Sequence, residues 1–119
     1  MVRGVRGATT AQANDRDAIF ARTGELIQAI VADNGIATAD IGAAIFSSTP
    51  DLDAAFPAAA ARALGWTEVP LFGAQEIDSP TGVPRCIRVL ILWNTDKSQA
   101  EIRHVYLHEA AALRQDIAR

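Results

Sequence analysis

The chain has 119 residues, with 11 basic and 14 acidic side chains and a formal charge of −3. That length predicts a single domain over residues 1–119, and a hydrophobic share of 50% is that of a folded globular protein. The acidic balance argues against a general nucleic-acid binder, which needs a basic surface. Because no apolar run approaches the ~20 residues that span a bilayer, we expect neither a nucleic acid nor a membrane as a partner.

The few cysteines and histidines bear on compartment and metal binding. Cys86 is the single cysteine and cannot form an internal disulfide, which favours a reducing cytoplasm. Residues 1–10 lack the long apolar stretch of a secretory signal. His104 and His108 are four residues apart, but their neighbours favour a strand, and so few histidines and cysteines do not make a convincing zinc site. We therefore expect no metal and no cofactor.

The first half of the chain predicts a strand, a helix and a second strand. Val2–Ala8 alternates between two faces. Asn14 is a cap residue for a helix that begins at Asp15, and Gly35 is well placed to end that helix. The short apolar run Ile41–Ser48 then predicts a buried strand.

The second half predicts one more helix and three more strands. In chain order these are a helix over Pro57–Leu64, a strand over Val69–Gln75, a loop over Asp78–Pro84, a strand over Cys86–Trp93, its antiparallel partner over Ile102–Leu107, and a helical tail from His108 that is mobile near Arg119. The whole order predicts an α/β (α+β) fold with a five-stranded mixed sheet and helices on one face. Two helices cannot cover both faces, so we expect the other face to be buried by self-association.

Arg88 is the most informative single residue. It lies in Cys-Ile-Arg-Val-Leu-Ile-Leu-Trp, where every other residue is apolar. A guanidinium in such surroundings is costly unless an anion or dipole compensates its charge. Two interpretations follow from the residues alone: a buried ion pair with a carboxylate such as Glu76, or a site for an anionic ligand.

Other candidates are each open to an ordinary interpretation. Arg6 lies on a glycine-flanked strand and is a surface arginine or a second anion-binding group. Arg62 and Arg114 fall on predicted helices, where solvation is the default. Tyr106 belongs to the core or faces a ligand, and Phe56 precedes a helix-starting proline as packing or as a lid. No phosphate-binding loop, nucleophile elbow or Cys–His pair with motif support is present.

The order of several segments resembles one enzyme family. The segments are Val2–Thr10, Ser47–Ala58, Gln75-Glu76, Cys86–Val89, Ile102–Leu107 and Leu113-Arg114. Together they resemble, over nearly the whole chain, the monofunctional trimeric α/β class of chorismate mutases. The resemblance implies a homotrimer, a pseudo-α/β-barrel, with three active sites in clefts between neighbouring subunits.

The resemblance also implies roles for individual residues. One subunit would supply Arg6, Glu76, Arg88, Tyr106 and Arg114, and the next would supply Phe56 and Arg62. Arg6 and Tyr106 would bind a substrate carboxylate, and Arg62 and Arg114 would add positive potential near the entrance. Glu76 would accept a hydrogen bond from the ring hydroxyl, helped by the backbone N–H of Gly73. Arg88 would reach the ether oxygen of the breaking bond and a carboxylate.

The implied reaction suits these side chains. Chorismate is a dianion, and its Claisen rearrangement to prephenate, a step toward phenylalanine and tyrosine in the shikimate pathway, needs no nucleophile, metal or proton transfer. The protein has to hold a compact conformer and stabilise charge that grows on the ether oxygen. An arginine does this well because it stays charged and is fixed in place before the reaction.

Three positions depart from the family pattern, and two alternatives stay open. The family often has lysine at Ala59, a small polar residue at Phe72 and cysteine at Gly73. These changes affect affinity more than reaction type. The alternatives are a trimer like the reactive-imine deaminases, for which we find no comparable motifs, and a non-catalytic trimer that binds an anionic metabolite.

Overall fold

The computed structural model describes residues 1–116, and side chains as far as Leu113. Its main elements are β1 (Val2–Thr10), α1 (Arg16–Asn34), β2 (Ile41–Ser48), α2 (Pro57–Ala63), β3 (Leu71–Gln75), β4 (Cys86–Asn94) and β5 (Val105–Tyr106). Short 3-10 segments are η1 (Thr38–Asp40), η2 (Gln99–Glu101) and η3 (His108–Asp116). The predicted order of strands and helices is confirmed. The predicted mobility near Arg119 falls outside the described residues. Among the residues that are described, none of the helices combines the length and the hydropathy of a membrane span.

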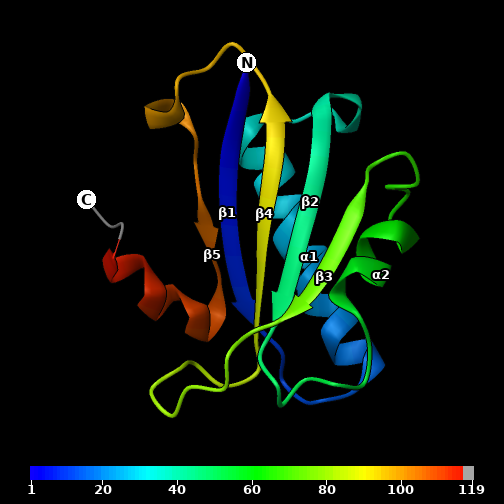
Figure 1. Cartoon of the computed structure of the whole chain (residues 1–119), viewed down its shortest axis with the longest axis vertical. Coiled ribbons are helices and arrows are strands. Elements are labelled where there is room, and N and C mark those ends of the chain that lie inside the picture. The colour runs from blue at the N-terminus through cyan, green and yellow to red at the C-terminus, as the bar shows by residue number, and fades with distance from the viewer. Residues whose placement is uncertain (117–119) are drawn as a thin grey trace.

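The strands form one mixed sheet in the order β3-β2-β4-β1-β5 (Figure 1). The central strand β4 is antiparallel to both β1 and β2, whereas β3 runs parallel to β2. In one row across the sheet, Arg88 lies between Ser47 on β2 and Ala8 on β1. This register places the polar side chains of Ser47 and Arg88 next to one another on the same face of the sheet.

The predicted pairing of the last strand is wrong. Ile102–Leu107 was expected as the antiparallel partner of β4, but β5 contains two residues and runs parallel to β1, with Ala8 opposite Tyr106. The reason is that β1 and β2 already occupy both sides of β4. The returning chain therefore crosses to the free side of β1, where the Leu107 N–H donates to the Ala8 carbonyl at 2.9 Å.

Helix α1 begins one residue later than predicted. Its cap is Asp15, whose carboxylate accepts a hydrogen bond from the Ala18 N–H at 2.8 Å. Asn14 instead ties down the loop before α2, because its Oδ1 accepts the Asp53 N–H at 3.0 Å. The predicted helix end is confirmed, since Gly35 adopts the left-handed conformation with φ of 72° that favours glycine.

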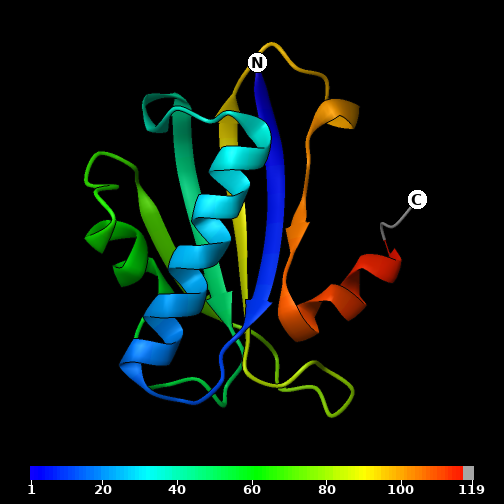
Figure 2. The same ribbon diagram turned by 180° about the vertical axis from the view of Figure 1, so that it is seen from behind.

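Helices α1 and α2 lie on one face of the sheet, as predicted, and α1 crosses the strands obliquely (Figure 2). Between α1 and the sheet lies the core, in which Val5, Phe46 and Ile91 are fully buried. The backbone approaches α1 most closely at Gly7, where an added Cβ would stand 2.6 Å from the Ile30 Cδ1. We call this side of the sheet the helix face.

The opposite side, which we call the open face, is largely uncovered (Figure 1). The segment η3 covers one end of it, where Ala110 packs with Ala8 and Cys86. Elsewhere apolar side chains are exposed: Ile45 is 37% exposed and Phe72 is 65% exposed. An apolar sheet face of this kind supports the expectation of a partner surface.

Candidate active site

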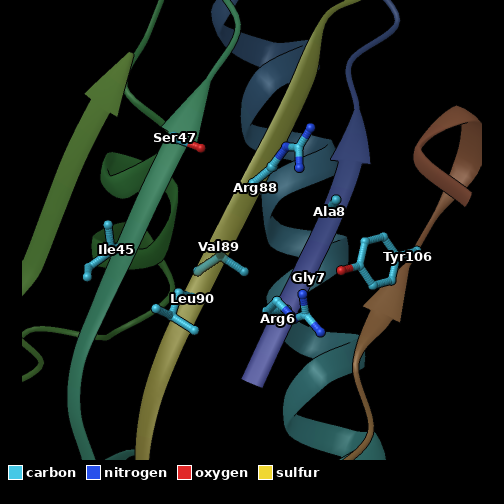
Figure 3. A pocket seen from close by; sticks show the side chains of 9 residues that line it. All are labelled: Arg6, Gly7, Ala8, Ile45, Ser47, Arg88, Val89, Leu90 and Tyr106. Atoms are coloured by element: carbon cyan, nitrogen blue, oxygen red, sulfur yellow. The ribbon is translucent and has the colours of Figure 1, made fainter. Parts of the chain in front are cut away.

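A hollow of about 250 Å³ lies on the open face, across β1, β2, β4 and β5 (Figure 3). It is lined by Arg6, Gly7, Ala8, Ile45, Ser47, Arg88, Val89, Leu90 and Tyr106. Strand alternation brings the side chains of Arg6 and Ala8, of Ile45 and Ser47, and of Arg88 and Leu90 to this face, because residues two apart on one strand share a face. Tyr106 extends its hydroxyl toward β1 (Figure 3). The sheet thus gathers two arginines and a phenol that lie far apart in the sequence.

Arg88 forms the ion pair with Glu76 that the sequence suggested. The Arg88 Nε lies 3.0 Å from the Glu76 Oε2. The pair is not buried, however, since the side chains are 46% and 21% exposed in the single chain. The expectation of an arginine enclosed by apolar neighbours is wrong. Successive side chains of β4 point to opposite faces of the sheet, and Arg88 points to the open face. An ion pair and an open ligand site therefore coexist at this residue.

A second and larger hollow, of about 620 Å³, adjoins the first at Arg88. Its walls are Glu76, the turn after β2, the loop over residues 77–84 and Leu113 of η3. Arg88 lines both hollows and is the residue that they share. A ligand with separated charged groups would find polar atoms on both sides of this residue.

The remaining predicted residues lie elsewhere in the single chain. Phe56, at the start of α2, is 78% exposed, and Arg62 is exposed in the last turn of that helix. Both residues lie outside the linings of the two hollows. Gly73, on β3, pairs with Phe46 on β2 and also lies outside these linings. The side chain of Arg114 falls outside the described part of the chain. The fold thus brings together Arg6, Arg88, Tyr106 and Glu76.

Sequence reasoning missed Ser47. Its hydroxyl donates to the Glu76 Oε2 at 2.6 Å, and the Glu76 N–H donates to the carbonyl of Ser48 at 2.9 Å. The available signal was a pair of serines at the end of an apolar strand. Such serines also end strands for purely local reasons, so the register with Arg88 was needed to give Ser47 a role.

Two ionisable groups beside the site have shifted pKa values. Burial raises the pKa of the Cys86 thiol, although the nearby Arg88 charge partly opposes this. Burial alone would raise the pKa of Asp51, but hydrogen bonds from the Thr49 hydroxyl and the Arg85 N–H lower it overall. Cys86 is therefore a neutral, buried thiol, and Asp51 fastens the turn after β2 to the start of β4. Among residues 1–113, no group of three His, Cys, Asp or Glu side chains could hold a metal ion.

The chain matches the model of the family described as chorismate mutase type I over residues 2–117. It belongs to that family. The chorismate mutase AroH of Thermus thermophilus is 49% identical over 118 residues, which are 98% of this chain and 97% of the relative. The Bacillus subtilis chorismate mutase AroH is 42% identical over 119 residues, or 99% of this chain and 94% of the relative.

A solved structure agrees with these matches in fold. The chorismate mutase from Clostridium thermocellum superposes with a TM-score of 0.89 at 47% identity, covering 92% of this chain and 97% of that one. The predicted membership of the type I chorismate mutases is confirmed, and with it the predicted activity, that of an isomerase. These matches favour the mutase over the deaminase-like alternative.

Proposed function

We propose that the junction of the two hollows is the site at which this chorismate mutase rearranges chorismate to prephenate. The observation that carries the proposal is the half-exposed Arg88, which pairs with Glu76 through its Nε at 3.0 Å. Arg88 lines both hollows, where its positive charge can be reached by an anionic ligand. A fixed cation in a partly enclosed site is suited to stabilise negative charge that grows on an ether oxygen.

Each residue of the site has a distinct part in this proposal. Arg6 and Tyr106 bind one carboxylate of the dianion at the β1–β5 side of the first hollow. Arg88 donates to the ether oxygen and to a carboxylate. Glu76 accepts a hydrogen bond from the ring hydroxyl, and this interaction fixes the ring in the conformation that reacts. No proton moves, so none of these groups needs to titrate.

The site in one chain is incomplete, and we propose that a homotrimer completes it. The exposed Ile45 and Phe72 give the open face an apolar surface that a second copy would cover. Phe56 and Arg62 of a neighbouring copy would then close the cleft, as the family resemblance implies, with Gly73 and Arg114 contributing to substrate binding. We also propose that the protein works in the cytoplasm, where its buried free Cys86 stays reduced.

Two measurements test this function and assembly. Purified protein incubated with chorismate should remove the diene absorbance of the substrate and produce prephenate. Light scattering coupled to size exclusion should report three chains. A folded protein that binds chorismate without converting it would instead support the non-catalytic alternative. A fully active monomer would exclude the trimer with sites between subunits.

A further inference from the structure

The Glu76 carboxylate is held at one oxygen and left open at the other. Its Oε2 receives the Ser47 hydroxyl at 2.6 Å and lies 3.0 Å from the Arg88 Nε. Its backbone N–H is bonded to the Ser48 carbonyl at 2.9 Å. Within the described part of the chain, no hydrogen bond or ion pair reaches Oε1. Strand β2 therefore fixes Glu76 through both its backbone and its side chain.

An arginine and a carboxylate ordinarily prefer a different arrangement. They commonly pair in a bidentate manner, with two parallel N–H···O bonds, because the guanidinium fork matches the carboxylate. A bidentate pair between Arg88 and Glu76 would occupy the Glu76 Oε1 and one terminal nitrogen of Arg88. These are the two groups that the proposed function directs at the substrate. Something has to keep the observed single contact from closing into the bidentate form.

We propose that Ser47 is a positioning residue that holds Glu76 in this single-contact geometry, an inference that rests on the proposed function. The Ser47 hydroxyl donates to Oε2, and the Arg88 Nε lies in ion-pair contact with the same oxygen, so groups on two different strands hold it in place. A distance of 2.6 Å is that of a hydroxyl donating to a charged carboxylate, which is a strong hydrogen bond.

The place of Ser47 in the sheet makes its hydroxyl a stable reference point. Ser47 pairs with Arg88 on β4 and with Ala74 on β3, so strands flank it on both sides. Serine is short, and its hydroxyl therefore follows the backbone of β2 closely. The sheet thus sets where Oε2 sits and, as a consequence, where Oε1 is aimed.

The matched variants are Ser47→Ala, Ser47→Thr and Ser48→Ala. Ser47→Ala should lower kcat about ten- to hundredfold, the weight of one hydrogen bond to a charged group, with a smaller change in KM. Ser47→Thr keeps a hydroxyl and should restore most of kcat. Ser48→Ala keeps the carbonyl that binds Glu76 and should retain the kcat of the parent. Thermal unfolding of all three should stay close to that of the parent protein.

A crystal structure of Ser47→Ala provides a readout that is independent of turnover. We expect both Glu76 carboxylate oxygens within hydrogen-bonding distance of the Arg88 guanidinium. Unchanged kcat in Ser47→Ala would overturn the proposal, and so would a crystal structure in which only Oε2 contacts Arg88. If the parent protein fails to convert chorismate, the proposed function is lost, and the crystal structure still decides whether Ser47 sets the geometry of Glu76.

Discussion

The same strands form both faces of the sheet, but the helix face forms the core and the open face carries the polar residues of the candidate site. On β4 the alternate residues Ile87, Val89 and Ile91 are buried beneath the helices. The residue between the first two, Arg88, is half exposed on the open face and lies next to Ser47. Residues that stabilise the core and a residue proposed to bind the substrate are therefore direct neighbours along β4. The helix face holds the strands in register, and the register brings the polar groups of the open face together.

The strongest test of this division replaces Arg88 with lysine. Lysine keeps the positive charge but loses the planar fork, so we expect Arg88→Lys to lower kcat by about 10²–10³-fold. Because the side chain is 46% exposed, the melting temperature should change little. Arg103→Lys, at an exposed position that lines neither hollow, should keep the parent kcat. Loss of stability with normal turnover of the folded fraction would show that Arg88 is only structural.

The helix face should respond in the reverse manner. A Cβ at Gly7 would meet the Ile30 Cδ1 at 2.6 Å and the Leu26 Cδ1 at 3.2 Å, so Gly7→Ala should destabilise the fold by about 1–3 kcal/mol through overpacking. Urea unfolding measures this change. Gly42→Ala is the control, because its Cβ would make only an ordinary contact at 3.7 Å. Equal stability of the two variants would contradict the close approach of α1 at Gly7.

The helix face was also the easier one to predict. Alternation predicted β1, a short apolar run predicted β2 and β-branched residues predicted β4, while Gly35 marked the end of α1. The cap was placed one residue too early because Asn14 and Asp15 are adjacent and both are good cap residues. Such errors depend on local competition between neighbours, and they leave the core unchanged.

The open face could be predicted only in part, because its contents depend on tertiary pairing. The pairing of Arg88 with Glu76 was foreseen, but its exposure was not, since a sequence does not say which side of a sheet the helices cover. The partner of β5 was missed because two paired residues carry almost no periodic signal. Ser47 gained a role only from its register with Arg88.

A smaller effect tests whether the open face is completed by a second copy. Ala59 lies in the first turn of α2 and lines neither hollow of the single chain. In the proposed trimer it stands at the mouth of a neighbour's cleft, so Ala59→Lys should lower KM several-fold with little change in kcat, the signature of uniform binding. The effect should shrink with added salt. Ala63→Lys on the same helix is the control, and an equal fall in KM there would mean that the charge acts only at long range.

A still smaller effect is expected from Asp51, in the turn that borders the site. Its pKa is lowered in the folded state, so it stabilises the fold above about pH 4, the ordinary range of aspartate, and this contribution is lost as the pH falls through the folded-state value. Asp51→Asn should therefore reduce stability at neutral pH and make no difference in strong acid. Thermal unfolding across that range measures the difference. A gap between parent and variant that widens toward acid would contradict the assigned hydrogen bonds from Thr49 and Arg85.

The smallest expected effect is the change in kcat when the pH is varied around neutrality. The cations proposed to bind the substrate are arginines, which do not titrate in the working range, and the rearrangement transfers no proton. We therefore expect kcat to stay nearly flat from mildly acidic to mildly alkaline pH. Cys86→Ala should keep most activity, because burial holds the thiol neutral and away from nucleophilic chemistry, and EDTA should have no effect.

A bell-shaped profile near neutrality would place a titrating group in the rate-limiting step. His104 and His108 would then be the first candidates. His104 accepts the Arg6 N–H at 2.9 Å beside the first hollow, and His108 is paired with Glu25 at 2.8 Å. Such a profile would require proton transfer on the open face and would contradict a purely pericyclic reaction. If kcat does not change with pH and Arg88→Lys still lowers kcat, the catalytic effect is explained by fixed charge and by positioning of the substrate, without proton transfer.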